Sequence, residues 1–340
     1  MDNKTESYIL KCEFLESWYE KRYGFTKYIF PTNAAMIVFI CINALLTVTS
    51  AVSNFVVTTA LWKFRKQREP SLFLVAYLSL VDLLHAVTSQ PLFVVVFISV
   101  KVEKTLSYGC ILNKCSLAAA LIFNGTSLLM VTAISVDKYL ALKLHLRYNH
   151  YVTRKRFNCA VVISFAISTA VAATRFLPNL IIFEISLMLF LISGIVLTSF
   201  TSAVVYRSVK NHNKRIRAQQ FNSIAYCANL RRHERSTNTT LYIMAACIVC
   251  FFPYAVVIFF VRNSIFTNYL PIMHLVVRTL LNGNSAVNPF LYCYRLRRIR
   301  YIVQETLNDV LPGFCLKVGC FLKKQKSKIR DGSAGVAIKF

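Results

Sequence analysis

SLFLVAYLSLVDLLHAVTSQPLFVVVFI, residues 71–98, is the stretch that sets the fold class of this 340-residue chain. Asp82 is its one Asp, Glu, Lys or Arg residue. About 20 apolar residues, at 1.5 Å per residue, cross the ~30 Å hydrocarbon core of a bilayer. Because lipid offers the backbone no hydrogen-bond partner, such a run must be helical. Residues 71–98 are therefore predicted to form a membrane-spanning helix.

Six other stretches have the same character, and the composition of the chain agrees with them. Hydrophobic residues make up 56% of the chain and charged residues 16%, against norms of about 45–50% and about 25%. This excludes a soluble enzyme, a nucleic-acid-binding domain or a disordered segment as the main body. The sequence predicts an all-α membrane protein, a seven-transmembrane helix bundle with spans at residues 33–62, 71–98, 110–136, 157–174, 179–206, 240–261 and 269–292.

The count of seven depends on residues 157–206, an apolar stretch too long for one span. Arg175 and Pro178 lie in its middle, and proline disfavours a helical conformation at the residue before it. A tight hairpin near residues 174–179 is the preferred interpretation. A re-entrant segment is the alternative, and it would reverse the side on which the chain ends.

The cations favour the hairpin and predict the orientation. With the N-terminus outside and seven spans, 29 of the 40 Lys and Arg residues lie on the cytoplasmic side, as the positive-inside rule requires. These cations attract anionic membrane lipids, so nucleic acid is not an expected partner. We predict a multi-pass plasma-membrane protein with an extracellular segment 1–32, a membrane domain 33–292, an amphipathic helix 293–312 and a cytoplasmic tail 313–340.

The outer segment has two further features. Residues 1–30 contain no hydrophobic signal sequence, so the first span is expected to act as its own signal anchor. Asn3-Lys4-Thr5 is an N-glycosylation acceptor, and its predicted extracellular position makes Asn3 a glycosylation candidate.

Asp82 lies in the middle of the second predicted span, where an ionisable side chain is costly and marks a functional site by default. Two interpretations are open: a neutral aspartic acid that joins helices by hydrogen bonds, or a carboxylate in a polar site shared by several spans. Oxygen ligands around one carboxylate suit a hard monovalent cation such as sodium, or a cluster of waters. The predicted partners at similar depth are Asn54, Ser127, Asn284, Ser285 and Asn288.

Short motifs mark fixed depths in the predicted spans: Asn54, the L-x-x-x-D of residues 78–82, Asp137-Lys138-Tyr139, Tyr206, Cys250-Phe251-Phe252-Pro253, and Asn284-Ser285-Ala286-Val287-Asn288-Pro289-Phe290-Leu291-Tyr292. Each motif alone is weak. In this order and at these depths, they resemble the rhodopsin-like (class A) G-protein-coupled receptors, and the resemblance covers residues 33 to about 312.

The resemblance implies a receptor that binds an extracellular ligand in the bundle and activates a heterotrimeric G protein inside the cell. Agonist binding is expected to shift a two-state bundle and move the inner end of the sixth span outward. The C-terminal helix of a G-protein α subunit would dock in the opened groove, against Lys138, Tyr139 and Leu146. The expected switch residues are Asp137, Lys138, Tyr139, Tyr206, Phe251, Pro253, Asn288, Pro289 and Tyr292.

The chain departs from the family pattern at the inner end of the third span. Lys138 stands where arginine is usual, which keeps the charge but loses the planar fork that holds Asp137. His233 and Glu234 occupy the part of the sixth span that normally carries the pairing acid. Our hypothesis is that the inactive state is weakly locked and that basal signalling is raised.

The cysteines depart from the pattern as well. The family's disulfide runs from the third span to the second outer loop, but Cys159, on the inner side, is the only cysteine between Cys115 and Cys227. A bond from Cys12 to Cys110 or Cys115 is a substitute, and the choice between them is open. The short second outer loop resembles the melanocortin receptors and the seventh-span ending resembles the adenosine receptors. We expect a divergent member of that branch.

The residues that face the expected ligand site narrow the ligand class. Ala120 stands where amine receptors carry a counter-ion Asp, and Asn282 where opsins carry the retinal-binding Lys, so neither ligand is expected. His274, Arg278 and Asn282 recur every four residues on one helical face. They either reach toward the membrane surface or form a wall that recognises an acidic or hydrogen-bonding ligand. The predicted ligand-binding residues are Ala120, Asn124, Phe251, His274, Arg278 and Asn282, with Lys114 opposite.

After Tyr292, basic and apolar residues alternate, which predicts an amphipathic helix on the inner membrane face until Pro312-Gly313 ends it. Cys315 and Cys320 follow and are predicted palmitoylation sites; reduced cytosolic thiols are the alternative.

Two other classes of membrane protein fit less well. No inverted repeat of broken helices favours a secondary transporter. An intramembrane enzyme would need paired acids or a Ser–His pair, and Asp82 with His85 is more simply structural. The chain is not expected to be an enzyme or to hold a cofactor other than a bound sodium ion.

Overall fold

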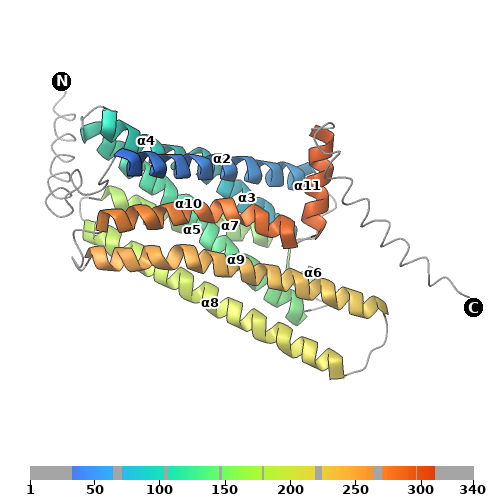
Figure 1. The fold of residues 1–340 in the computed structure, drawn as a ribbon. Coiled ribbons are helices and arrows are strands. Elements are labelled where there is room, and N and C mark those ends of the chain that lie inside the picture. Colours follow the sequence, from blue (N-terminus) through green and yellow to red (C-terminus); the bar gives the residue numbers. More distant parts are fainter. Residues whose placement is uncertain are drawn as a thin grey trace, which may run out of the picture.

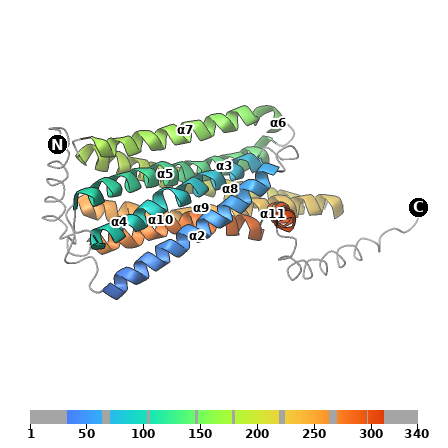
Figure 2. The same cartoon turned by 90° about the horizontal axis from the view of Figure 1, so that it is seen from above.

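The computed structural model describes residues 33–63, 71–102, 106–144, 148–177, 180–218, 224–262, 270–295 and 297–310. Within these residues all regular structure is helical, and the long helices lie side by side in one bundle (Figure 1; Figure 2). This confirms the predicted fold class. The elements are α2 (Asn33–Lys63), α3 (Ser71–Val87), α4 (Ser89–Val102), α5 (Leu106–Leu144), α6 (Tyr148–Tyr151), α7 (Arg154–Ala173), the 3-10 turn η3 (Thr174–Phe176), α8 (Leu180–Ala218), α9 (Ile224–Arg262), α10 (Leu270–Arg295) and α11 (Arg297–Val310).

Six described segments are long and apolar enough to cross a bilayer: 37–63, 72–96, 112–141, 154–176, 181–211 and 241–260. The helix of the seventh predicted span, α10, is not among them. It nevertheless packs against α2 and α9 within the bundle (Figure 1). Its polar residues Arg278, Asn282, Asn284, Ser285 and Asn288 are all buried, so the bundle rather than lipid surrounds them and α10 completes the seven-helix arrangement.

Three helices extend beyond the predicted apolar runs at the predicted cytoplasmic side. α5 ends at Leu144, α8 ends at Ala218 and α9 begins at Ile224, well outside the runs that end at 136 and 206 and begin at 240. Hydropathy marks the part of a helix that lies in lipid, whereas Lys-, Arg- and Ala-rich sequence keeps a backbone helical in water. The predicted spans are therefore present, and the helices continue beyond them on this side.

The second span consists of two helices, α3 and α4, that meet at Thr88. Pro91 in the first turn of α4 has no N–H, so the ladder of backbone hydrogen bonds is interrupted there. The Thr88 hydroxyl donates to the Leu84 carbonyl oxygen at 2.6 Å, and the Leu92 N–H reaches the Thr88 carbonyl oxygen at 3.3 Å. Directly after this break, Ser89 and Gln90 are both buried in the bundle.

α5 is the central helix, because it contacts α3, α4, α7, α8 and α9. In its most apolar window 67% of the residues are buried, against 17% in α2. Two glycines permit this close packing. A Cβ on Gly194 of α8 would lie 2.6 Å from Leu128 Cδ2, and one on Gly125 of α5 would lie 2.9 Å from Ser168 Oγ of α7.

α7 continues into η3, as the predicted hairpin requires. The Thr174 hydroxyl lies 3.0 Å from Ser186 Oγ of α8 and so joins the two arms. Arg175 is buried, with its guanidinium carbon 5.3 Å from the centre of the Phe183 ring.

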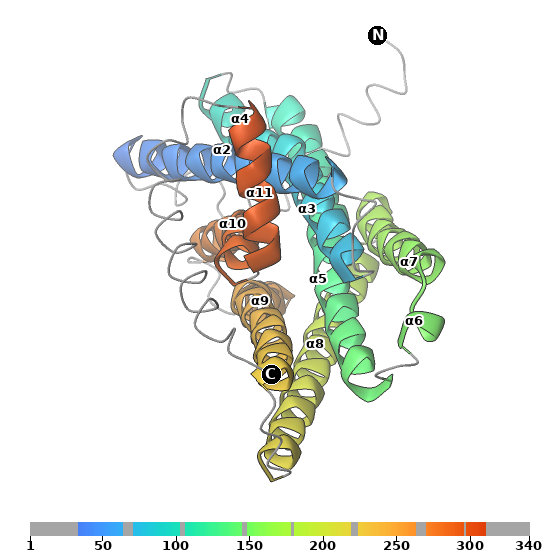
Figure 3. The same ribbon diagram turned by 90° about the vertical axis from the view of Figure 1, so that its right-hand side faces the viewer.

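α11 is the helix predicted at residues 293–312, and it begins later, at Arg297. It lies across the inner ends of α2 and α10 (Figure 3). Ile299, Ile302 and Val303 are buried on one face, while Lys63 of α2 pairs with Asp309. The helix is therefore amphipathic as predicted.

Candidate functional site

The carboxyl group of Asp82 is enclosed between three helices. Asp82 is 1% exposed on α3, and Asn288 of α10 donates from Nδ2 to its Oδ2 at 2.8 Å. Ser127 of α5 lies beside the same carboxyl. The structure thus brings together three of the six residues predicted for the ion or water site.

Several buried oxygens in this part of the bundle have no hydrogen-bond partner among the described residues. They are Asp82 Oδ1, Asn288 Oδ1, Ser79 Oγ and Asn54 Oδ1. Buried polar groups are normally satisfied by protein or by ordered water. Carboxylate, amide and hydroxyl oxygens are also the donors that hard cations prefer. The donors present therefore fit a sodium ion or a small group of waters. The described residues contain no cluster of His, Cys, Asp and Glu that would hold a transition metal.

Ser285, predicted beside Asp82, is the centre of a different network. Its hydroxyl accepts from Gln90 Nε2 at 2.9 Å and from Ser50 Oγ at 3.1 Å, and donates to the Asn282 carbonyl oxygen at 3.0 Å. Asn54 Nδ2 donates to the Ser285 carbonyl oxygen at 2.9 Å. The network therefore joins α2, α4 and α10 one turn further out than the Asp82–Asn288 contact.

His85 extends this network to α5. Its Nδ1 lies 3.4 Å from Ser285 Oγ and 3.2 Å from Gln90 Nε2, and its Nε2 lies 3.1 Å from Asn124 Nδ2. His85 is 1% exposed. The ring therefore links the seventh span to Asn124 on the central helix. Asn284, the remaining residue of the predicted site, accepts a hydrogen bond from Cys247 Sγ of α9 at 3.6 Å.

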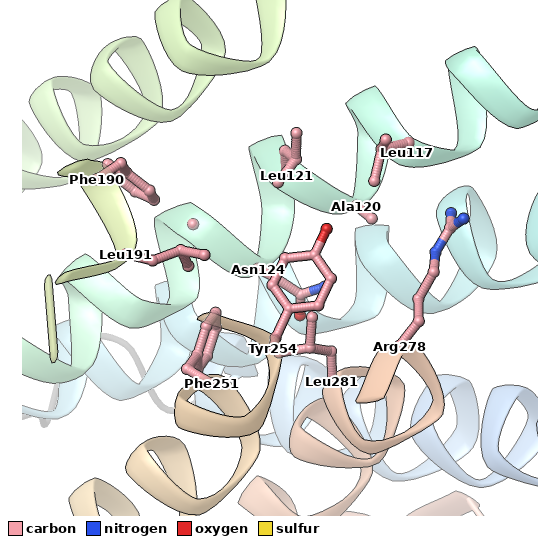
Figure 4. Close-up of a pocket in the computed structure, with 11 residues that line it drawn as sticks. Leu117, Ala120, Leu121, Asn124, Phe190, Leu191, Phe251, Tyr254, Arg278 and Leu281 are labelled. Carbon is pink, nitrogen blue, oxygen red and sulfur yellow. The ribbon is translucent and has the colours of Figure 1, made fainter. Parts of the chain in front are cut away.

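A cavity lies between α5, α8, α9 and α10, with a volume of about 20 Å³, which is room for about one water molecule. Figure 4 shows Phe190 at one end and Arg278 at the other, with the Phe251 and Tyr254 rings between them. Asn124 also lines it. The remaining wall is apolar and includes Leu117, Ala120, Leu121, Leu191 and Leu281.

Arg278 faces the interior of the bundle and not the membrane surface. It is 3% exposed, and its Nη2 donates to Ser116 Oγ at 2.6 Å and its Nη1 to Asn113 Oδ1 at 3.3 Å. The guanidinium carbon lies 4.1 Å from the centre of the Phe93 ring of α4. Neutral groups on α4 and α5 thus fix the orientation of a buried cation at one end of the cavity.

Four of the predicted ligand-binding residues, Ala120, Asn124, Phe251 and Arg278, line this cavity. Asn282 does not: it is buried, and its Nδ2 donates to Asn43 Oδ1 of α2 at 3.2 Å. Lys114 is half-buried on α5 and is not part of the wall.

At the inner end of α5, Asp137 is 3% exposed and makes two polar contacts of different strength. The Tyr148 hydroxyl of α6 donates to its Oδ1 at 2.5 Å. Lys138 Nζ lies 3.8 Å from its Oδ2, a contact of charge but not of hydrogen-bond length. Lys143 Nζ lies 5.8 Å from the Tyr139 ring. The described partners of Asp137 therefore come from α5 itself and from α6.

The two tyrosines predicted to take part in switching lie in different environments. Tyr292 of α10 is fully buried, and its hydroxyl has no hydrogen-bond partner among the described residues. Tyr206 of α8 is 55% exposed, so the structure does not bring the two together. Pro253 and Pro289 lie inside α9 and α10 as expected.

Several predicted residues fall outside the described part of the chain. They are Asn3, Cys12, Leu146, Cys315 and Cys320. The side chains of Cys110, His233, Glu234 and His274 are also outside it, although the backbone at these positions is helical. Cys115 is an exposed free cysteine in the structure, so the predicted alternative of a Cys12–Cys115 bond is wrong. Glycosylation, palmitoylation and the Cys12–Cys110 bond remain predictions.

Among the first-span residues of the outer network, sequence reasoning predicted Asn54, as a partner of Asp82, but missed Asn43 and Ser50. Asn43, Ser50 and Asn54 recur at intervals of seven and four residues, which places them on one helical face, and all three are buried. That spacing was a usable signal. The apolar cavity wall gave none, because Leu117, Leu191 and similar residues cannot be distinguished in sequence from ordinary core residues.

Comparisons with known proteins agree with this fold. The family model of the 7 transmembrane receptor (rhodopsin family) matches residues 53–181. The human adenosine receptor A2a is 21% identical over 311 residues, which cover 80% of this chain and 72% of that receptor. The bovine adenosine receptor A3 is 27% identical over 142 residues, which cover 42% of this chain and less than half, 43%, of that receptor.

More distant proteins extend over more of the chain. The octopamine receptor beta-2R of Chilo suppressalis is 20% identical over 88% of this chain and 86% of its own. Among solved structures, squid rhodopsin superposes with a TM-score of 0.70 at 17% identity, covering 82% of this chain and 87% of that chain. The superposition shows a shared fold.

Proposed function

We propose that this chain, a member of the rhodopsin-like (class A) family of seven-transmembrane G-protein-coupled receptors, binds an extracellular ligand inside the bundle and activates a heterotrimeric G protein. The chain is distantly related to the adenosine receptors. The cavity that Asn124 shares with Arg278 carries this proposal. Asn124 also contacts His85, so a ligand in the cavity acts directly on the network that joins α2, α4 and α10.

The size of the cavity supports activation by selection of a conformation. Its present volume of about 20 Å³ is far below that of a ligand pocket, about 300–1,000 Å³. A ligand therefore binds best when the walls on α8, α9 and α10 lie further from α5. Because a ligand shifts an equilibrium through its differential affinity for two states, binding favours the wider bundle.

α9 and α10, which line the cavity, each contain a proline that allows the helix to bend. Pro253 in α9 and Pro289 in α10 each remove a backbone hydrogen bond and permit a local bend. Below them, the buried Tyr292 hydroxyl is free to find a partner in a second arrangement. Outward movement of α9 would open a groove for the α subunit of the G protein, with Lys138, Tyr139 and Leu146 on its wall.

Sodium at Asp82 is part of the proposal. Asp82, Ser127 and Asn288 would hold the ion, which would stabilise the conformation in which α3 and α10 are joined at 2.8 Å. The positive charge of the ion would offset the negative charge of the buried Asp82 carboxylate.

The distribution of cations supports an orientation of the chain in the membrane. We infer a plasma-membrane location with the outer ends of the spans and the Arg278 cavity toward the outside, and α11 on the inner leaflet, where its basic residues attract anionic lipid. Figure 1 shows α11 at the opposite end of the bundle from the start of α2.

The test is nucleotide exchange on purified G proteins of each subtype, with the receptor in lipid nanodiscs. Adenosine, lipids, peptides and organic acids are compared with an unliganded sample and with empty nanodiscs. We expect at least one G-protein subtype to exchange faster with receptor than with empty nanodiscs. A second sample with Pro289→Ala, which removes the bend, should lose ligand-stimulated exchange. No exchange above empty nanodiscs on any subtype, with any ligand, would contradict the proposal, as would measured solute flux through the purified protein.

A further inference from the structure

Two arginines are buried among the described residues, and their surroundings differ. Arg278 donates to Ser116 Oγ and to Asn113 Oδ1. Arg175 is 6% exposed, yet within the described part of the chain its Nε has no hydrogen-bond partner and the side chain forms no ion pair. Arginine stays charged in proteins, and a buried charge is costly unless it is paired and hydrogen-bonded. Arg175 therefore needs an acceptor that the described chain does not supply.

The contacts that Arg175 does make cannot replace an anion. Arg175 lies in η3, the turn between α7 and α8, at the end of the bundle away from α11 (Figure 1). The negative pole of α7 and the positive pole of α8 meet at this turn and largely cancel. The guanidinium carbon lies 5.3 Å from the centre of the Phe183 ring, in the first turn of α8. The ring face attracts a cation but carries no net charge.

The hydroxyl groups of the turn serve a different purpose. Thr174 Oγ1 donates to the Val171 carbonyl oxygen at 2.6 Å and lies 3.0 Å from Ser186 Oγ. Ser186 Oγ in turn donates to the Phe183 carbonyl oxygen at 2.9 Å. These contacts tie η3 to both helices, so the turn that carries Arg175 is fixed before a ligand binds and little freedom is lost on binding.

The surface beside Arg175 is apolar. Phe176 and Leu177 follow it in the chain, Ile181 and Ile182 lie on the first turn of α8, and all four side chains are exposed. At the end of a membrane span, such side chains face the boundary between hydrocarbon and headgroups. A molecule that reaches the guanidinium there has apolar chains next to an anionic group, which is the chemistry of a phospholipid. The planar guanidinium also matches two oxygens of a phosphate.

We propose that Arg175 binds the phosphate group of a phospholipid in the leaflet on the side opposite α11, with the acyl chains of the lipid over Phe176, Leu177 and Ile182. In the orientation proposed above, this is the outer leaflet. Two phosphate oxygens accept hydrogen bonds from the guanidinium, and the bound lipid braces the turn between α7 and α8. The site is separate from the cavity between α5, α8, α9 and α10 and does not depend on G-protein activation.

Native mass spectrometry of the full chain in detergent micelles tests the proposal by counting bound lipids. The probes are dioleoylphosphatidylcholine, dioleoylglycerol, which has the same chains but no phosphate, and inorganic phosphate. Phosphatidylcholine has no net charge, so cations elsewhere on the chain do not attract it as they attract anionic lipids. We expect it to bind about 10- to 100-fold more tightly than dioleoylglycerol, from the gain of charge-assisted hydrogen bonds.

Variants assign this preference to one side chain. Arg175→Gln should remove the preference for phosphatidylcholine over dioleoylglycerol. Arg175→Lys keeps the charge but loses the planar fork, so it should keep part of the preference. Lys114→Gln is the matched control, because Lys114 is a half-buried cation on the outer part of α5, away from this turn. It should keep the full preference.

If Arg175→Gln does not fold, a phosphatidylcholine with a photoreactive group in its acyl chain locates the site on the natural chain. Labelling within residues 174–183 should reach half of its maximum at a lower lipid concentration than labelling of the exposed side of α2 at Ile42, Leu45 and Val48.

Equal binding of phosphatidylcholine and dioleoylglycerol would overturn the proposal, and so would an unchanged preference in Arg175→Gln or labelling with the same concentration dependence in both regions. Binding of inorganic phosphate as tight as that of the lipid would also overturn it, because the anion would then come from water.

Discussion

The outer and inner halves of the bundle are held together in different ways. In the outer half, Ser285 and His85 sit among direct side-chain bonds that join α2, α4, α5 and α10. In the inner half, one amide donor meets Asp82 at 2.8 Å. Asp137 accepts one hydrogen bond, from the Tyr148 hydroxyl at 2.5 Å, and its contact with Lys138 is longer, at 3.8 Å. Several inner groups, including the Tyr292 hydroxyl, have no partner among the described residues.

This difference indicates which half moves. The outer network makes many direct bonds, although Gln90 Oε1, Asn54 Oδ1 and Asn124 Oδ1 in it have no hydrogen-bond partner among the described residues. Because these direct bonds would be lost in another arrangement, the network resists change. Polar groups that lack hydrogen-bond partners lose no hydrogen bonds when the helices shift, and they can gain new ones. The outer network therefore acts as a stiff frame beside the cavity, and the inner half is where two arrangements of similar free energy are available. Four substitutions test this contrast, from the largest expected effect to the smallest.

Ser285→Ala should destabilise the receptor most. The substitution removes an acceptor from Gln90 and Ser50 and a donor to the Asn282 carbonyl. Three bonds at about 0.6 kcal/mol each, the average measured in a membrane protein, give a loss of about 2 kcal/mol. Unfolding of the purified receptor in nanodiscs measures it.

Ser193→Ala is the matched control for this loss. The Ser193 hydroxyl bonds only to the Phe190 carbonyl of its own helix on an exposed face, so its removal should cost below about 0.5 kcal/mol. Equal losses for the two variants would show that the outer network is no stiffer than the lipid-facing surface.

Asp82→Asn should remove the response to sodium. At a sodium concentration about fivefold above the dissociation constant, binding stabilises the natural chain by about 1 kcal/mol. Replacing choline chloride by sodium chloride at constant ionic strength measures this as a rise in melting temperature. The variant, which lacks the carboxylate charge, should show no rise.

Ser285→Ala serves here as the control because its side chain belongs to the outer network. It should keep the sodium response in spite of its lower stability. A response lost equally in both variants would place Ser285 in the ion site, as the sequence alone predicted, and would remove the distinction between the two halves.

The fold was predictable because lipid imposes simple requirements on a chain. Long apolar runs, cations on one side and prolines at bends identify the seven spans and their order. The polar residues Asp82, Ser127 and Asn288 could also be predicted to meet, since each lies at mid-depth in its span.

Rotation about each helix axis was harder to predict. Depth placed Ser285 beside Asp82, but the face it presents is set by packing against Gln90 and Ser50. Tyr206 was placed at the right depth and proves to be exposed. Helix ends in water were missed for a similar reason, because they depend on local propensity and not on the thickness of the membrane.

Tyr148→Phe should raise basal signalling. The Tyr148 hydroxyl donates to the carboxyl of Asp137 at 2.5 Å and joins α6 to the inner end of α5. A hydrogen bond of about 0.7–1 kcal/mol corresponds to a rise of about three- to fivefold in the population of the alternative state. Nucleotide exchange on the G protein without ligand is the measurement.

Tyr77→Phe is the control for the loss of a tyrosine hydroxyl. Tyr77 donates to Asn158 Oδ1 at 3.0 Å between α3 and α7, away from Asp137. Basal exchange should be unchanged in this variant. A rise of equal size there would mean that any loosening of the bundle raises activity, and that the inner half is not special.

Lys138→Arg should have the smallest effect and the opposite sign. The Lys138 ammonium lies 3.8 Å from Asp137 Oδ2, whereas the planar fork of arginine can donate two bonds to a carboxylate. A gain of about 0.4 kcal/mol, within the range for partly exposed ion pairs, lowers basal exchange about twofold.

Lys143→Arg is the control, because it makes the same change on an exposed side chain one to two turns further along α5. Lys143 lies against the Tyr139 ring and not against an acid, so its replacement should leave exchange unchanged. Because the expected decrease comes from a stronger contact with one carboxylate, it should disappear in the Asp137→Asn background. A decrease that persists there would mean that arginine acts on the G protein and not on the inner lock.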